Sequence, residues 1–253
     1  MLQIKRFFYP ELILFTLIFS HNCLMNNQPL KKIYKKLKDR NLSFKHVCEV
    51  GVYLPETSNI IDFIKEGIRA TLVEADFVTV EKIKKYFSGY NIEIFPVAIW
   101  DYNGSIKLSK AAASTFVTDL KASPAIVNDQ YKINEENTFE VPCRIFSDID
   151  DGTIDLLSID IEGGEWFVLK HLQSRPAIIS VETHGKYYTN PFIIEIKNWM
   201  IKEHYQIWYK DQSDTVFVRN GIFSPNAMDK METQLAEWKL KWKKFKRKFK
   251  KRK

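Results

Sequence analysis

The stretch Asp155-Leu-Leu-Ser-Ile-Asp160-Ile-Glu162-Gly163-Gly164-Glu165 indicates the fold of this chain more directly than any other segment. An apolar run leads into spaced carboxylates and a Gly-Gly turn, and apolar residues from Trp166 onward continue as a helix. A buried parallel strand is built from residues such as Leu and Ile, and it excludes unpaired charges. Carboxylates that follow such a strand lie at its carboxyl end, where open α/β sheets bind their ligands. We therefore predict that Asp160 and Glu162 belong to a ligand site.

Three more apolar segments end in acidic or polar side chains. They are Ala-Ile-Ile-Ser-Val-Glu-Thr-His-Gly at 177–185, Lys-His-Val-Cys-Glu-Val-Gly at 45–51 and Arg-Ala-Thr-Leu-Val-Glu-Ala-Asp at 69–76. The carboxyl ends of parallel strands meet at one edge of a sheet. We therefore expect the polar residues of all three segments to gather near Asp160.

Strands and helices alternate from residue 45 to residue 220. The apolar periodicity predicts helices over residues 28–43, 59–67, 78–88, 164–172 and 191–203. It predicts strands over residues 45–51, 69–76, 92–100, 155–161, 177–182, 205–210 and 215–219. Strands joined by helices form a parallel sheet with helices on both faces, and the short connection at 211–214 makes the last two strands an antiparallel hairpin. The expected fold is α/β: a doubly wound, mostly parallel, seven-stranded, Rossmann-like sheet with this terminal hairpin.

Residues 101–146 interrupt this alternation. Asn103-Gly104, between Trp100 and Ile106, is a strong hairpin signal. Residues 139–145 alternate like an exposed edge strand. We expect this insertion to shape the part of the site that selects a substrate.

The composition excludes several classes of protein. The chain has 253 residues, of which 45% are hydrophobic and 14% aromatic, so wholesale disorder is excluded. Its three cysteines form no CxxC pair, which argues against a disulfide framework or a zinc site. A reducing, cytoplasmic location is therefore expected.

The positive charge is concentrated at the carboxyl end. Residues 230–253 hold twelve Lys or Arg and two Glu, so of the net charge of +7 the other 229 residues carry −3. We divide the chain into an apolar and basic helical segment at 1–43, a domain at 44–222 and a basic amphipathic tail at 223–253. The apolar run 7–19 is too short to span a bilayer comfortably. It is expected to cover the domain or lie on a membrane surface, with a signal peptide as the alternative.

The tail has an aromatic stripe and a basic remainder. Its apolar residues recur at spacings of three and four, at Leu235, Trp238, Trp242, Phe245 and Phe249. Such a helix is typical of peripheral membrane contact, here through residues 235–249. A solvated tail and a nucleic-acid contact are the alternatives, and the acidic body makes nucleic acid the less favoured partner.

The first two predicted strands end in residues that fit a nucleoside ligand. Glu49 and Gly51 stand at the first strand-to-helix turn, where a glycine lets a ligand approach the backbone. Glu74 ends the second strand, and a carboxylate there typically binds ribose hydroxyls.

The order of these motifs resembles the FkbM family of methyltransferases. The resemblance covers residues 45–220 and rests on the Asp-x-Glu-Gly-x-Glu strand, the Glu49 turn, Glu74, the segment 96–104 and the segment 178–184. It implies a class I fold, S-adenosyl-L-methionine as the methyl donor, and an oxygen acceptor on a sugar or another small molecule. The acceptor could be lipid-linked, which would explain apolar and basic appendages.

The resemblance also implies roles for single residues. Donor-binding roles fall on Glu49 and Gly51 at the methionine part, Glu74 at the ribose, and Ala98 and Ile99 at the adenine. Asp160 and Glu162 would face the acceptor, and His184 is the expected general base because its ordinary pKa lies near neutrality. One departure is the absence of a second glycine after Gly51, where the chain has Pro55 and Glu56 instead.

Several alternatives remain open on the sequence alone. The chain could be a catalytically impaired binding module, given its altered glycine turn, or a nucleic-acid methyltransferase recruited by its tail. Asp160 could merely cap the helix that follows, and Glu182 could pair with a basic residue at 175 or 186. Asp160 and Glu162 could grip a divalent metal, but no set of three ligands emerges, so no metal is expected.

Overall fold

The main sheet has seven strands in the computed structural model of the chain, which describes residues 29–111 and 114–250. The strands are β1 (His46–Val50), β2 (Arg69–Val73), β3 (Ile92–Phe95), β8 (Leu156–Ile159), β9 (Ile178–Glu182), β10 (Tyr205–Lys210) and β11 (Asp214–Arg219). Their order is β10-β11-β9-β8-β1-β2-β3. The first five strands along the chain pair in parallel, and β11 pairs antiparallel with β9 and β10. The predicted α/β fold with a seven-stranded, mostly parallel sheet is confirmed.

The strand order reverses between β1 and β8. From β1 the chain proceeds outward through β2 to β3, and it then returns to place β8 on the other side of β1. In open α/β sheets, ligands bind in the crevice beyond the carboxyl ends of strands at such a reversal. A crevice beside Val50 and Ile159, the last residues of the two strands, is therefore the position where this topology predicts a ligand.

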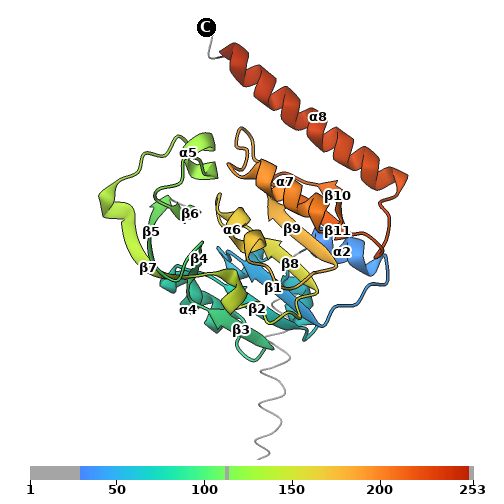
Figure 1. The fold of residues 1–253 in the computed structure, drawn as a ribbon, viewed down its shortest axis with the longest axis horizontal. Coiled ribbons are helices and arrows are strands. Elements are labelled where there is room, and N and C mark those ends of the chain that lie inside the picture. The colour runs from blue at the N-terminus through green and yellow to red at the C-terminus, as the bar shows by residue number, and fades with distance from the viewer. Residues whose placement is uncertain (1–28, 112–113, 251–253) are drawn as a thin grey trace, which may run out of the picture.

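Helices cover both faces of the main sheet (Figure 1). On one face lie α2 (Lys32–Lys38), α3 (Ile61–Lys65) and α4 (Phe77–Tyr86), and on the other α6 (Glu165–Lys170) and α7 (Ile193–Lys202). Leu37, Ile64 and Ile83 are fully buried against the first face, and Val168 and Ile196 against the second. The strands are apolar on both sides because each side packs against helices. All five predicted helices are present within a few residues of their expected ends.

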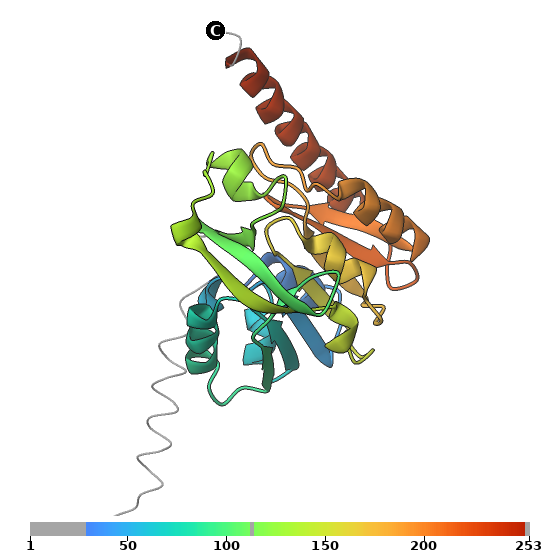
Figure 2. The ribbon, with the colours of Figure 1, turned by 60° about the vertical axis from the view of Figure 1, so that its left-hand side comes forward.

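The insertion forms a second sheet of four strands, which the sequence did not predict. They are β4 (Ala98–Ile99), β5 (Gly104–Ala111), β6 (Ser114–Val117) and β7 (Thr138–Arg144), in the order β4-β7-β5-β6, and a short helix α5 (Pro124–Asn128) follows β6. Figure 2 shows the long β5 and β7 ribbons lying in front of the main sheet. The strand expected over 92–100 is thus divided between β3 and β4. Pro96 lies at the division, and it has no N–H with which to continue a ladder.

One prediction within the insertion is wrong, and one is correct only in part. The turn at Asn103-Gly104 does not join neighbouring strands, because β7 lies between β4 and β5. The Asn103 side chain instead accepts the Ile145 N–H at 2.8 Å and donates to Asp148 at 2.7 Å, which holds the turn against the end of β7. The edge-strand prediction for 139–145 is correct in part. Only Cys143 and Arg144 of β7 pair with the two-residue strand β4, and the rest of β7 is bordered by β5 alone.

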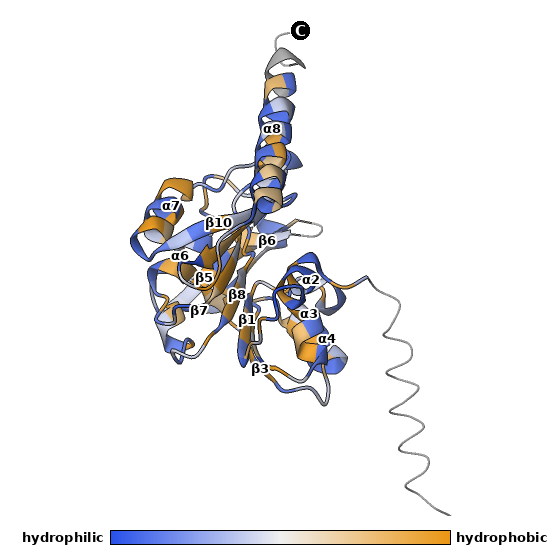
Figure 3. Cartoon of the chain, turned by 90° about the vertical axis from the view of Figure 1, so that its right-hand side faces the viewer, coloured by the Kyte–Doolittle hydropathy of each residue, from blue (hydrophilic) through white to orange (hydrophobic). Residues whose placement is uncertain are grey.

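The segments at both ends of the described chain pack together. Helix α8 (Ala227–Lys250) begins beside α2, where the buried Asp229 binds Lys36 at 2.9 Å and Arg40 at 2.6 Å. A further ion pair, Lys210 to Glu237 at 2.7 Å, ties α8 to β10. Figure 3 shows the rest of α8 extending beyond the sheets. Helix α2 and the first turns of α8 are thus integral to the folded body, although we had divided them from residues 44–222.

The apolar run 7–19 and Cys23 lie outside the described residues. Cys48 and Cys143 are buried free thiols. None of the helices in the described ranges combines the length and hydropathy that a bilayer span requires.

Candidate functional site

A cavity of about 400 Å³ opens at the carboxyl ends of β1, β2 and β8. Its walls come from the main sheet, from the second sheet and from the turn between β10 and β11. The volume lies in the range of pockets that enclose a small molecule or a cofactor. The predicted residues Glu49, Gly51, Glu74, Ala98, Ile99, Asp160 and Glu162 all line it.

Gly51 allows the end of β1 to pass against the end of β8. Its φ is +90°, and a Cβ atom at this position would lie 1.8 Å from the backbone oxygen of Asp160. The Gly51 N–H donates to Val73 at 2.9 Å, which also fixes the turn to β2. A glycine is therefore required here mainly because two backbone segments approach each other closely. Its contribution to the cavity wall follows from that packing.

Glu74 holds the turn after β1 while it lines the cavity. Its carboxylate accepts the Val52 N–H at 3.0 Å and the Asp76 N–H at 2.7 Å. Burial raises the pKa of Glu74 to about 7. Each carboxylate oxygen has a second lone pair, so Glu74 retains the capacity to accept hydrogen bonds from a ligand.

Glu49 is buried at the end of β1 and is held by the segment before α3. Its carboxylate accepts hydrogen bonds from the Ser58 hydroxyl and, at 2.8 Å, from the Asn59 N–H. Burial raises the pKa of Glu49 to about 7. Residues 57–59 also line the cavity, so the segment that holds Glu49 forms part of its wall.

The second sheet supplies cavity residues that the sequence did not reveal. Lys110 of β5 pairs with Asp76, the N-cap of α4, and both side chains line the cavity beside Phe116 of β6. The sequence contains no pattern that pairs residue 110 with residue 76, because the two come together only when the insertion folds back over the main sheet. Asp214, the first residue of β11, also lines the cavity, although the sequence assigned it only to the connection between the last two strands.

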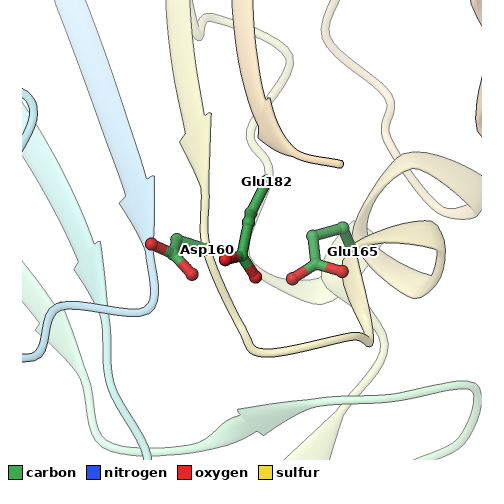
Figure 4. A group of neighbouring side chains, drawn as sticks. All are labelled: Asp160, Glu165 and Glu182. Carbon is green, nitrogen blue, oxygen red and sulfur yellow. The ribbon is translucent and has the colours of Figure 1, made fainter. Parts of the chain in front are cut away.

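Three carboxylates form a cluster beside the cavity (Figure 4). Asp160, Glu165 and Glu182 each offer an oxygen, and these oxygens lie within 4.8 Å of one another. Glu165 accepts the N–H groups of Ile161 and Gly163, both at 3.0 Å, and the Asn190 side chain donates to its second oxygen. Glu165, the last acid of the Asp-x-Glu-Gly-x-Glu motif, thus belongs to this cluster. The motif contained this residue, but we did not predict it as a site residue.

Burial and mutual repulsion disfavour charge within this cluster. Burial raises the pKa of Glu165 to about 7. It also raises the pKa values of Asp160 and Glu182 well above their usual range, and the neighbouring carboxylates add to both shifts. Such a cluster needs protons or a cation to compensate its charges.

The alternative roles weighed for two of these residues find no support. The N-cap of α6 is Gly164, without a side-chain cap bond, so Asp160 does not cap this helix. Arg175 binds Glu203 at 2.8 Å, and within the described ranges Glu182 has no ion pair with a basic residue.

Glu162 reaches toward the second sheet from a strained backbone position. Its φ is +59°, which a residue other than glycine seldom adopts. One carboxylate oxygen accepts a hydrogen bond from Ser114 of β6 at 2.8 Å, and the other is buried without a partner. Burial raises the pKa of Glu162 to about 7. The arrangement places a carboxyl group between the two sheets, at the cavity wall.

His184 lies apart from the other predicted site residues. Its Nε2 donates to the Asp211 carbonyl at 3.2 Å, so Nδ1 accepts from the Thr183 hydroxyl at 2.8 Å. Burial lowers the pKa of His184, and the side chain is not part of the cavity wall. The geometry does not set this imidazole opposite Asp160 as we expected. We assign it no part in the chemistry below.

Comparison with known proteins agrees with the motif order. The sequence profile of the methyltransferase FkbM domain matches residues 49–207. No curated protein sequence matches the chain. The solved structures that resemble it include two of the methyltransferase domain of bacterial CtHen1, CtHen1-CN and CtHen1-C, at 14% and 15% identity. Both alignments cover 77% of this chain and 98% of the other, with TM-scores of 0.41 and 0.39. Similarity this low carries no information on function.

Proposed function

Because this chain belongs to the FkbM family of methyltransferases, we propose that it transfers a methyl group from S-adenosyl-L-methionine to a hydroxyl oxygen of a small polar acceptor, such as a sugar. One observation carries the proposal: a single cavity joins the residues expected at the donor to the carboxylates expected at the acceptor. The rival of a catalytically impaired module is less favoured. Residues 57–59 reach the cavity despite the altered glycine turn.

The donor-binding part of the proposal rests on chemical fit. Glu74 would accept hydrogen bonds from ribose hydroxyls with its free lone pairs, and the apolar side chains of Ala98 and Ile99 would receive the adenine. Glu49 and Gly51 would lie beside the methionine part. When bound, S-adenosyl-L-methionine supplies an electrophilic methyl group on positively charged sulfur. The acidic character of this cavity favours a cationic ligand.

The acceptor-binding part rests on the carboxylates. An acceptor hydroxyl must be aligned and must lose its proton as the new O–CH₃ bond forms and the S–CH₃ bond breaks. Asp160 and Glu162 line the cavity as the groups that would orient the hydroxyl and receive the proton. The second sheet, with Phe116 and Lys110, would exclude water and shape the acceptor pocket.

Donor binding is tested by isothermal titration with S-adenosylhomocysteine. We expect Glu74→Gln to weaken binding by about 1.5 kcal/mol or more, roughly tenfold, because hydrogen bonds to a charged group are replaced by weaker ones. The matched control is Glu81→Gln on the exposed face of α4, outside the cavity. Equal affinity of wild type and a folded Glu74→Gln would reject this donor site.

We further propose that α8 holds the enzyme at an anionic membrane surface. The apolar side chains of its stripe are about half exposed: Met231, Leu235, Trp238, Trp242 and Phe245. At about 100° per residue these positions fall on one side of the helix. Asp229, Glu237 and Lys244, which contact the body, fall on the other. The stripe therefore faces away from the protein.

The lysines beside the stripe indicate what kind of membrane surface it would bind. Lys239, Lys241 and Lys246 are exposed on the flanks of the stripe. Apolar residues flanked by lysines suit an interface with anionic lipid headgroups. A lipid-linked acceptor would then be reached at the same surface.

A further inference from the structure

We propose that Asp160, Glu165 and Glu182 bind a divalent cation of the oxygen-preferring kind, such as Mg²⁺ or Mn²⁺, beside the cavity. The sequence led us to expect no metal, because only the fold brings the third ligand to the other two. The role of this cation in methyl transfer rests on the proposed function, but its binding does not.

The geometry of the cluster suits a single ion. The three side chains come from different elements: Asp160 follows β8, Glu165 begins α6 and Glu182 ends β9. Figure 4 shows the three carboxylates next to one another, with that of Glu182 between those of Asp160 and Glu165. Hard divalent cations bind oxygen at about 2.0–2.6 Å, so ligands on opposite sides of one ion are about 4–5 Å apart. The oxygens of the cluster lie within 4.8 Å of one another and meet this limit.

Within residues 29–111 and 114–250, no basic side chain forms an ion pair with the cluster. Glu165 is 0% exposed and Glu182 6% exposed, yet no salt bridge of the described residues involves either of them or Asp160. Buried carboxylates without a positive partner are costly. A divalent cation would compensate two of the three charges and bind all three side chains.

A second observation points to a ligand here. The Oε2 atom of Glu182 is buried and has no hydrogen-bond partner among the described residues, and Figure 4 shows the Glu182 carboxylate between those of Asp160 and Glu165. The hydroxyl of Tyr188, which is 0% exposed, also lacks such a hydrogen-bond partner, and the carboxylates of the cluster act on its pKa. Buried polar atoms in native proteins are nearly always paired. A cation would engage the Glu182 oxygen, and a water molecule on that cation would accept the Tyr188 hydrogen.

The surroundings also orient the ligands. The Asn190 side chain donates to Glu165, and the Ile161 and Gly163 N–H groups hold its other oxygen. Such outer partners are typical of metal sites, where they fix the direction of each ligand. Asp160 is the member of the cluster that lines the cavity. A cation on Asp160 would therefore bind an acceptor oxygen from the cavity and lower the pKa of its hydroxyl.

The test measures Mn²⁺ binding to the full chain by electron paramagnetic resonance, after treatment with a chelator and its removal. We expect one site per chain. Glu182→Gln and, separately, Asp160→Asn should each weaken binding by roughly tenfold or more. The control is Glu81→Gln on the exposed face of α4, outside the cavity and the cluster, which should bind Mn²⁺ like wild type. Circular dichroism checks the fold of each variant, and Asp160→Asn serves if Glu182→Gln fails to fold.

S-adenosylhomocysteine binding, measured on the same samples, separates the two proposals. Absence of Mn²⁺ binding by folded protein at millimolar concentration would overturn the cation site and leave the donor site standing. Equal Mn²⁺ affinity of the wild type and both cluster variants would overturn it as well. Mn²⁺ binding that depends on the cluster, without S-adenosylhomocysteine binding, would support the cation site and reject the methyl-transfer proposal.

Discussion

Glu49 is a buried acid whose protonation is linked to folding. Burial raises its pKa to about 7, Asp214 opposes its ionisation further, and Lys31 and the bonds from Ser58 and Asn59 favour it. An acid with a raised pKa in the folded state holds its proton more tightly there than in the unfolded chain. Its contribution to stability is therefore complete below the ordinary pKa of about 4.5 and is lost as the pH rises to about 7.

This linkage predicts a pH-dependent effect of Glu49→Gln. The amide keeps an acceptor for Asn59 but cannot ionise. Relative to wild type, the variant should gain on the order of 2 kcal/mol in free energy of unfolding between pH 5 and pH 7.5, because it escapes the cost of ionising a buried carboxyl. Urea denaturation in the presence of a chelator measures this difference. The free energy of unfolding of Glu81→Gln, a substitution exposed on α4, should change with pH as that of wild type does. If the free energy of Glu49→Gln also changes as that of wild type does, burial of Glu49 is not the cause.

Single residues in the motifs were predictable to different degrees. Glu74 and Asp160 line the cavity as expected, because a carboxylate after an apolar strand has few other places to lie. His184 was misplaced, because its sequence position fixes only the end of β9. Its neighbours Thr183 and Asp211 then determine where the ring points. Rotamers and hydrogen-bond partners arise from tertiary packing, which strand periodicity does not encode.

The contact between the ends of β1 and β8 depends on Gly51. A Cβ atom at residue 51 would lie 1.8 Å from the backbone oxygen of Asp160, and the φ of +90° also disfavours any residue with a side chain. Gly51→Ala should therefore separate the two strand ends and cost about 3 kcal/mol or more of stability. Gly89→Ala is the matched control: its φ is +85°, but no atom lies within 4 Å of its Cβ position.

The control should cost only about 1 kcal/mol, the price of the backbone conformation alone. Denaturant titration of the two variants gives both values. Similar losses in Gly51→Ala and Gly89→Ala would show that φ, rather than the close approach to Asp160, makes glycine necessary at residue 51.

The elements of the main sheet were predictable, whereas the second sheet was not. Strands such as β8 and β9 are short apolar runs joined by a helix. Strands connected in this way nearly always lie parallel in one sheet with a right-handed crossover. The insertion contains alternating strands whose partners are distant in sequence, as Gly104 with Cys143 and Ala98 with Cys143 show. Alternation identifies a strand but leaves its neighbours undetermined. The side of the cavity that this sheet builds was unpredictable for the same reason.

The two ends of the described chain meet on one side of the protein. Lys32, Lys36 and Arg40 of the first segment bind Asp229 and Glu232 of α8, so the basic tail starts from an anchored, charge-compensated turn. Beyond Glu237 the helix carries its lysines without acidic residues in the sequence. This arrangement gives α8 a fixed direction relative to the cavity. A membrane bound by its stripe would consequently meet the protein in one orientation.

The membrane role of α8 predicts a loss of vesicle binding when the stripe is removed. Trp238 is 62% exposed and Trp242 is 47% exposed, and their rings stack 6.1 Å apart. The double variant Trp238→Ala and Trp242→Ala should bind anionic vesicles at least about tenfold more weakly, because each buried aromatic side chain contributes on the order of 1–2 kcal/mol. Flotation with phosphatidylserine-containing liposomes measures the bound fraction. Higher salt should weaken binding of the wild type, since each lysine near the surface adds about 1 kcal/mol.

The control for this experiment is Ile201→Ala on α7, which removes an apolar side chain that is 72% exposed but stands outside the stripe. The vesicle-bound fraction of this variant should equal that of wild type. Both comparisons use the full chain, so the apolar run at 7–19 is common to every sample. Equal flotation of the double variant and wild type would reject the membrane role of α8. Duplex DNA that displaces wild-type protein from the vesicles at matched salt would favour a nucleic-acid partner instead, since lysines also bind phosphate backbones.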